Sequence, residues 1–439
     1  MAFGMHFNVR IVFAVAVIAA VAVTPVALAR AAPVAAPPAN APSPATRAQL
    51  TLVVGTVLSP PHVVLGADNR QHLAHELQLL NTAPFPIKLK RLDTIDPATG
   101  AVLQSLRGAG LAALVKRPEG APFDGTLGAG LSGIVILDAM LPKNAPLPAN
   151  LTHRITLGFT PPPGFPALPK VYTLGRTPVG QDRPMVIGRP LRGARWVAVN
   201  GCCDALTAHR GGIVPVNGAL VAPERFAIDF VQLDRQRRLF SGPVGRLSGY
   251  PGYGEQVLSV AAGTVVGTHD GEPDQIPPNL PPFSLDTAGG NWVVVDIGGG
   301  HFAFYAHLQP HSLTVTTGDR VRRGQVLGLL GNSGNSSAPH LHFHIMDGPS
   351  TPVADSLPYQ FADFTSSGTV TDENAMFSGL PAPIGPQLAG PHHHQLPLNL
   401  QVIDFPLGPG LRTGGVPGEP DEVDDLRGGL VASGGRSSV

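Results

Sequence analysis

The chain has 439 residues, which suggests two or three domains of ordinary size. Lys+Arg and Asp+Glu number 30 each, so there is no electrostatic case for binding nucleic acid or an anionic membrane surface. Gly and Pro number 53 and 47, and this composition favours β-sheet with many turns. No lysine follows Lys170, which excludes a Schiff-base, phosphate-loop or lipoyl attachment lysine from the rest of the chain.

Residues 1–29 have the pattern of a signal peptide. Arg10 supplies the positive charge, an apolar stretch follows over residues 11–23, and Ala27 and Ala29 form an A-x-A cleavage site. We expect cleavage after Ala29, and hence export to the periplasm, cell envelope or extracellular space. The alternative is an uncleaved anchor, because residues 11–29 carry no charge and are nearly long enough to span a bilayer. The Ala/Pro-rich residues 30–48 read as an extended linker.

Residues 49–190 predict a β-sandwich domain. Short segments of alternating polarity are separated by turn residues, and no cluster of carboxylates or histidines accompanies them. The spacing is typical of an immunoglobulin-like sandwich with a structural or binding role. The segments are residues 50–58, 75–82, 87–96, 132–141 and 153–159.

Residues 195–358 form a second predicted β-domain, which is rich in histidine. Eight of the 16 histidines lie between residues 209 and 344. A β/loop extension follows over residues 359–412, with a possible strand at 398–405 and an expected surface loop at 392–394. Residues 413–439 have the composition of a disordered tail. Overall we predict an all-β protein.

The two cysteines, Cys202 and Cys203, are adjacent in the sequence. They are compatible with a vicinal disulfide ring or with two buried thiols. Because no other cysteine is present, a disulfide framework is excluded, and the lack of a histidine at metal spacing argues against a cysteine-based zinc site.

Three segments predict strands that carry polar side chains on one face. In residues 340–345, alternation places Leu341, Phe343 and Ile345 toward a core. The opposite face then carries His340, His342 and His344. Three imidazoles on one face indicate a metal site, since a simple solvent face more often carries Thr, Lys or Glu. Residues 301–308 place Phe302, Phe304, Ala306 and Leu308 on one side and His301, Ala303, Tyr305 and His307 on the other.

The third segment is residues 225–230. Phe226, Ile228 and Phe230 are expected to face inward, whereas Arg225 and Asp229 share the outer face. An aspartate is unfavourable in a strand, so Asp229 needs a reason to be there. One explanation for Asp229 is metal ligation, and the other is a salt bridge to Arg225.

These segments, together with residues 290–300 and the run GDRVRRGQVLGLLGNSGNSSAPHLHF at 318–343, resemble the LytM/lysostaphin-type zinc endopeptidases that cut cell-wall peptides. The resemblance covers about residues 205–350. It implies a core built on an antiparallel β-sheet, a groove between loops, one Zn²⁺ per chain, and peptidoglycan or another peptide as substrate. It also implies that Asp229 and His342 are metal ligands and that His340 and His307 are catalytic. His340 would act as general base, and His307 would stabilise the oxyanion or protonate the leaving amine.

The family pattern places a third ligand four residues before Asp229, where this chain has Arg225. Arginine stays protonated and cannot ligate a metal. Either the ligand is lost and the protein is inactive, or His209 supplies the imidazole from one arm of a hairpin that turns at Asn217 and Gly218. We expect the metal ligands to be His209, Asp229 and His342.

Two further departures concern the surroundings of the site. His344 stands where many relatives have Glu, and it is either a partner of His342 or a substitute ligand. The Pro-rich insertion 269–288 is expected to form a groove wall or lid. The sequence therefore predicts an exported zinc metalloendopeptidase. The alternatives are a degenerate peptidase-fold protein that binds or regulates cell-wall machinery, and a metal-storage protein.

Overall fold

The computed structural model describes residues 48–117 and 120–406, so the predicted signal peptide, nearly all of the linker and the tail at 413–439 lie outside the described residues. Everything below concerns a compact unit that begins at Leu50. Strands dominate it, which confirms the all-β prediction. Among the described residues, no helix has the length and apolar character needed to cross a membrane.

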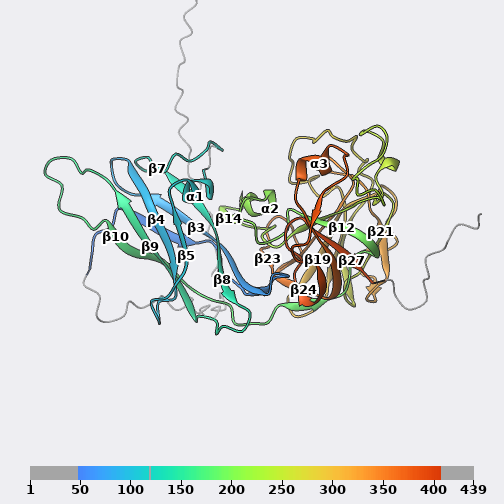
Figure 1. Ribbon diagram of the computed structural model, residues 1–439, viewed down its shortest axis with the longest axis horizontal. Coiled ribbons are helices and arrows are strands. Elements are labelled where there is room, and N and C mark those ends of the chain that lie inside the picture. The colour runs from blue at the N-terminus through green and yellow to red at the C-terminus, as the bar shows by residue number, and fades with distance from the viewer. Residues whose placement is uncertain (1–47, 118–119, 407–439) are drawn as a thin grey trace, which may run out of the picture. The chain divides into compact units, whose positions relative to one another are not determined.

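Two antiparallel sheets make up the N-terminal sandwich (Figure 1). Their shared core includes Leu77 and Val135 from one sheet and Leu92 and Ile155 from the other. All five predicted segments are strands, whereas the immunoglobulin-like strand order stays a prediction. One sheet holds β1 (Val53–Val57), β2 (Val64–Leu65), β3 (Arg70–Asn81), β6 (Val115–Lys116) and β8 (Ser132–Pro142). The other holds β4 (Ile87–Ile95), β5 (Val102–Arg107), β7 (Thr126–Leu127), β9 (Asn150–Gly158) and β10 (Val171–Pro178).

A sheet of 13 strands forms the second part of the fold, in the order β11-β24-β27-β12-β15-β22-β19-β18-β17-β20 with β23, β25 and β26 beside it. The C-terminal strands therefore complete the same sheet that carries the histidine-rich strands. Its central strands are β12 (Gly193–Val199), β15 (Ile228–Gln232), β22 (Leu341–Met346), β19 (Phe302–Leu308), β18 (Asn291–Asp296) and β17 (Gly263–His269). The others are β11 (Met185–Ile187), β20 (Arg320–Val321), β23 (Ser356–Leu357), β24 (Tyr359–Val370), β25 (Ile384–Gly385), β26 (Gly390–Gln395) and β27 (Gln401–Phe405).

Short elements surround this sheet. The strands β13 (Val214–Val216) and β14 (Ala219–Val221) form a small hairpin, and β16 (Gln256–Leu258) pairs with β21 (Val326–Leu329). The helices are α1 (Gly108–Ala113), α2 (Ala208–Gly211), α3 (Glu373–Phe377) and the 3₁₀ turn η1 (Leu247–Gly249).

Alternation along β22 is as predicted. Leu341, Phe343 and Ile345 belong to the main hydrophobic core, so the histidines between them lie on the other face. The neighbouring strand β15 places Asp229 directly opposite His342 in antiparallel register. Pairing of these two strands therefore brings the Asp and the His of the motif together.

The predicted faces of β19 are wrong. Ala303 and Tyr305 belong to the main core, whereas Phe304 packs against His342 on the histidine face. The ring of His307 nevertheless lies among the site histidines because its φ is +62°, a left-handed conformation that breaks the alternation of the strand. Leu308 consequently packs in the main core, as Tyr305 does.

The predicted position of His209 on a hairpin arm is also wrong. The hairpin does turn at Asn217 and Gly218, but it ends before Asp229 and begins after His209. His209 instead lies in α2, whose first turn is capped by the side chain of Thr207 accepting from the Arg210 backbone N–H.

The expected surface loop at residues 392–394 is part of a strand, β26, that pairs with β24. The proline at position 391 is tolerated because β26 pairs on one side only, and a missing N–H does not interrupt an edge strand. His392 is buried and stacks on Phe364, whereas His393 pairs with Asp363.

Candidate metal centre

Three residues from separate elements bring metal-binding atoms together. His209 from α2, Asp229 from β15 and His342 from β22 offer donor atoms that all lie within 4.8 Å of one another. His209 Nε2 lies 3.2 Å from Asp229 Oδ2, and His342 Nδ1 lies 2.9 Å from Asp229 Oδ1. These are the three residues that the sequence suggested as ligands.

Two of the three donor separations fit a tetrahedral ion. Zinc bonds of about 2.0–2.1 Å place neighbouring donor atoms about 3.3 Å apart, close to the two separations seen here. Each of the three residues is less than a tenth exposed. Two imidazoles and one carboxylate without thiolate suit a catalytic zinc site, which keeps a fourth position open.

The carboxylate of Asp229 is surrounded by donors. Asn200 Nδ2 donates to Oδ2 over 2.8 Å, and His340 Nε2 lies 3.3 Å from Oδ1. Burial raises the pKa of Asp229, but the imidazoles of His209 and His340 outweigh it and hold that pKa well below its usual value. The carboxylate is therefore ionised and available as an anionic ligand.

His209 is oriented by its other ring nitrogen. Its Nδ1 atom lies 3.1 Å from the backbone oxygen of Ala227, so the Nδ1–H group donates there and Nε2 faces Asp229. This arrangement, in which one nitrogen is fixed by a carbonyl and the other faces the site, is typical of metal-ligating histidines.

His307 and His340 lie beside the three candidate ligands, with ring centroids 4.6 Å apart. His307 Nδ1 lies 2.8 Å from the Ser333 carbonyl oxygen, and His340 Nδ1 lies 2.8 Å from that of Ala338. Each Nδ1–H therefore donates to a carbonyl, so the Nε2 atom of each ring is the one available for proton transfer.

The surroundings push the pKa values of these two rings in opposite directions. Burial, reinforced by the imidazoles of His340 and His342, holds the pKa of His307 well below its usual value. Burial also lowers the pKa of His340, but the Asp229 carboxylate outweighs it and leaves that pKa raised. Such a separation is typical of two groups that share acid–base work.

His344 contacts the candidate ligand next to it. Its Nδ1 atom lies 3.0 Å from His342 Nε2, which makes it a partner of His342 rather than one of the three clustered donors. The carboxylate of Glu224 lies 4.0 Å from the same His342 nitrogen and is partly exposed. Neither Glu224 nor Asn200 was predicted from the sequence, because neither belongs to a recognisable motif.

Arg225 does not pair with Asp229, which was one of the two explanations offered for the strand aspartate. Its guanidinium is buried and donates to the carboxylate of Glu76 in strand β3 of the sandwich. The carboxylate of Asp229 therefore contacts the site histidines rather than Arg225.

The insertion 269–288 is bound to the loop that orients His307. Asp274 accepts from the backbone N–H of Asn332, directly before Ser333, and from the hydroxyl of Tyr253. The insertion also exposes apolar side chains, as a wall that contacts substrate would. These are Ile276, Leu280, Phe283 and Leu285.

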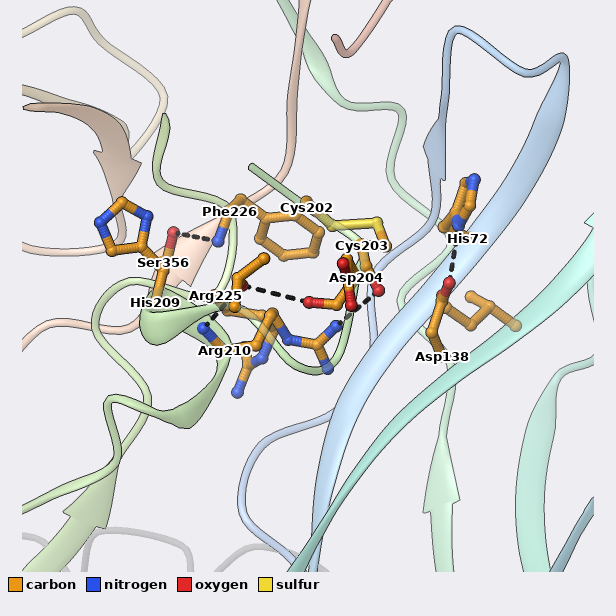
Figure 2. Close-up of a disulfide and its surroundings, with 12 residues drawn as sticks. His72, Asp138, Cys202, Cys203, Asp204, His209, Arg210, Arg225, Phe226 and Ser356 are labelled. Carbon is orange, nitrogen blue, oxygen red and sulfur yellow. Dashed lines mark hydrogen bonds and ion pairs between the residues drawn. A yellow bond between two sulfur atoms is a disulfide. The ribbon is translucent and has the colours of Figure 1, made fainter. Parts of the chain in front are cut away.

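A second group with metal-ligand geometry contains His72, Asp138 and Cys203. The Cys203 sulfur is bonded to Cys202, so the vicinal ring is the alternative that the structure contains and no thiolate is available (Figure 2). His72 is instead held between Asp68 and Asp138.

Comparison with known proteins gives a family match over part of the chain. Residues 250–353 match the model of peptidase family M23. This part of the chain is similar to the M23 peptidases. The range matched to the M23 model includes His307, His340 and His342, whereas His209 and Asp229 precede it.

The M23 relatives align over short segments. Glycyl-glycine endopeptidase ALE-1 of Staphylococcus capitis is 37% identical over 90 residues, which cover 20% of this chain and 24% of that protein. Peptidoglycan DD-endopeptidase ShyA of Vibrio cholerae is 40% identical over 57 residues, or 13% of each chain. The chain thus spans about a quarter or less of the length of these curated relatives. The catalytic domain of lysostaphin from Staphylococcus simulans has 25% identity and a TM-score of 0.20, covering 33% of this chain and 80% of that domain.

Proposed function

We propose that this chain is an exported zinc metalloendopeptidase that hydrolyses peptide bonds of peptidoglycan. The observation that carries the proposal is the cluster of His209, Asp229 and His342 donor atoms within 4.8 Å, beside the paired rings of His307 and His340. The peptidoglycan substrate is supported by the names of the M23 relatives. Export is supported by the pattern of residues 1–29, which lie outside the described residues.

In this proposal His209, Asp229 and His342 hold one zinc ion. A zinc ion in such a site supplies Lewis-acid chemistry: it polarises the carbonyl of the peptide bond and makes a water molecule more acidic. The carboxylate of Asp229, once committed to a cation, no longer stabilises a proton on His340. The His340 ring is then neutral, with its Nε2 lone pair directed toward the site.

The two unligated histidines carry the protons. His340 Nε2 takes a proton from the attacking water, and the Ala338 carbonyl stabilises the resulting imidazolium through the Nδ1–H bond. His307 is held by Ser333 in the same tautomer, on the other side of the 4.6 Å ring pair. His307 Nε2 receives that proton across the ring pair and, once protonated, stabilises the oxyanion and protonates the leaving amine.

Digestion of purified peptidoglycan with the full chain tests this function. We expect release of peptides bearing new amino termini, loss of release with a zinc chelator, and recovery with added Zn²⁺. His342→Ala removes a candidate ligand and should abolish both bound zinc and peptide release. The matched control is His393→Ala, which removes a largely exposed histidine of the same sheet. A zinc-free chain that releases no peptides would instead favour a non-catalytic role in binding or regulating cell-wall machinery.

A further inference from the structure

A single carboxylate of the sandwich contacts both chain segments that carry the N-terminal metal ligands. Glu76 lies on β3 and is fully buried. Arg225 Nε donates to its Oε2 atom over 2.8 Å, and Arg210 Nη2 lies 3.4 Å from its Oε1 atom. Figure 2 shows Arg210 and Arg225 together beside the Cys202–Cys203 ring, between α2 and the sandwich.

Both arginine side chains have most of their hydrogen-bond partners in the sandwich; the exception is the Cys203 carbonyl, 3.4 Å from Arg210 Nη1. Arg225 is less than a tenth exposed and also donates to the Ser59 hydroxyl over 2.7 Å. Arg210 is almost fully buried and donates to the Leu137 carbonyl of β8 over 2.8 Å. Two buried guanidiniums repel each other, and Glu76 is the carboxylate that both share and the largest favourable charge for each, with Asp138 adding to it at Arg210 and Asp355 at Arg225. Their positions are therefore strongly determined by Glu76.

The other ends of these contacts lie at the metal centre. Arg210 follows His209 directly in the single-turn helix α2, so fixing its side chain fixes the helix. Arg225 begins the segment that leads through Ala227 to Asp229, and the Ala227 carbonyl accepts from His209 Nδ1. Glu76 thus contacts both Arg210 and Arg225, and the segments that carry these arginines are joined by the hydrogen bond between His209 and Ala227.

We propose that Glu76 is a positioning residue for the metal centre, through which the N-terminal sandwich places His209 and Asp229. Arginine at position 225 then has a role of its own. It replaces an imidazole that would bind metal with a guanidinium that binds the sandwich, and His209 provides the ligand. The inference rests on the proposed zinc function, because it concerns how that site is built.

The test compares metal binding by the full chain and by Glu76→Gln. Asp93→Asn is the matched control, since Asp93 is also a buried carboxylate held by two arginines, Arg91 and Arg154, within the sandwich. Zinc affinity is measured by competition with a chromophoric chelator, and the ligand geometry by the visible absorption of the Co²⁺-loaded chain. Far-UV circular dichroism confirms that each variant is folded at the temperature used.

We expect Glu76→Gln to bind zinc about 10-fold or more weakly and to change the Co²⁺ spectrum, as loss of outer contacts to metal ligands does. Asp93→Asn should match the wild type in both measurements. If Glu76→Gln does not fold, Glu76→Asp and Arg225→Lys keep the charges but misalign the contact, and we expect weaker zinc binding by both. Wild-type affinity and spectrum in the folded Glu76 variant would overturn the positioning role alone. Absence of metal binding by the wild type would overturn the proposed function and this inference with it.

Discussion

His209 Nε2 lies 3.2 Å from Asp229 Oδ2, although a helix end, a hairpin and a loop separate the two residues in the chain. This proximity gives the metal centre a third candidate ligand in a chain whose family motif has lost one. Because of this proximity, Arg225 no longer indicates that the metal site has lost its third ligand.

We predict that His209→Ala loses bound zinc. The side chain is buried against Asp229 and makes no contact that Ala could replace. Removing one of three protein ligands should reduce the zinc content of the purified chain from about one ion per chain to near zero. Metal analysis after dialysis checks this, with His393→Ala as the control. Full zinc content and full peptide release by His209→Ala would show that another residue is the third ligand.

We predict that Arg225→His does not tighten zinc binding, although it recreates the histidine position of the family pattern. The substitution leaves the buried Glu76 carboxylate with Arg210 alone. Breaking such a buried pair costs about 3 kcal/mol of unfolding free energy. Urea denaturation should therefore show a lower midpoint, and zinc affinity should not rise. An Arg225→His variant of wild-type stability with tighter zinc binding would contradict this account.

Local pattern was sufficient to predict much of the fold. The five sandwich strands follow from alternating polarity between turn residues, and the faces of β22 follow from the same rule. Asp229 and His342 were predicted as ligands through the family resemblance, and strand pairing does place them opposite each other.

Other features depend on contacts that no local pattern encodes. The left-handed φ of His307 places its ring in the site, whereas simple alternation assigned the neighbouring residues of the strand to the wrong faces. The placement of His209 depends on a one-turn helix fixed through Arg210 to a distant strand. Glu76 belongs to no sequence motif, and its partners lie far along the chain.

We predict a pH-dependent contribution to stability from His72. Burial lowers its pKa, but hydrogen bonds to Asp138 and Asp68 outweigh burial and raise the pKa of His72 to about 9. Because the folded value exceeds the unfolded value of about 6.5, this stability is fully present below about pH 6.5 and is lost as the pH rises through about 9. The difference corresponds to roughly 3 kcal/mol.

Urea denaturation between about pH 8 and pH 9.5 checks the His72 prediction. The unfolding free energy of His72→Gln should fall less steeply with pH than that of the wild type. His75→Gln is the control, since burial lowers the pKa of His75 to about 4 and the ring is neutral in both states above about pH 8. Equal slopes for the wild type and His72→Gln would contradict the proposed protonation of His72.

We predict that metal removal destabilises the folded chain. A ligand that binds only the folded state stabilises it by about 4 kcal/mol at a thousand times its dissociation constant. A chelator should therefore lower the Tm of the wild type by several degrees, and added Zn²⁺ should restore it. His342→Ala should show no such shift in a thermal scan. A chelator effect of equal size in His342→Ala would place the stabilising metal elsewhere.

We predict that His344 tunes the affinity of the site through His342. With His342 Nδ1 facing Asp229, its Nε2–H donates to His344 Nδ1 over 3.0 Å, which fixes the tautomer that ligation requires. His344→Phe keeps a buried ring but removes the acceptor, so zinc should bind about 10- to 100-fold more weakly. His344→Glu restores an acceptor oxygen and should retain most of the affinity, as chelator competition would measure. Equal zinc affinity in His344→Phe and the wild type would mean that this contact does not orient His342.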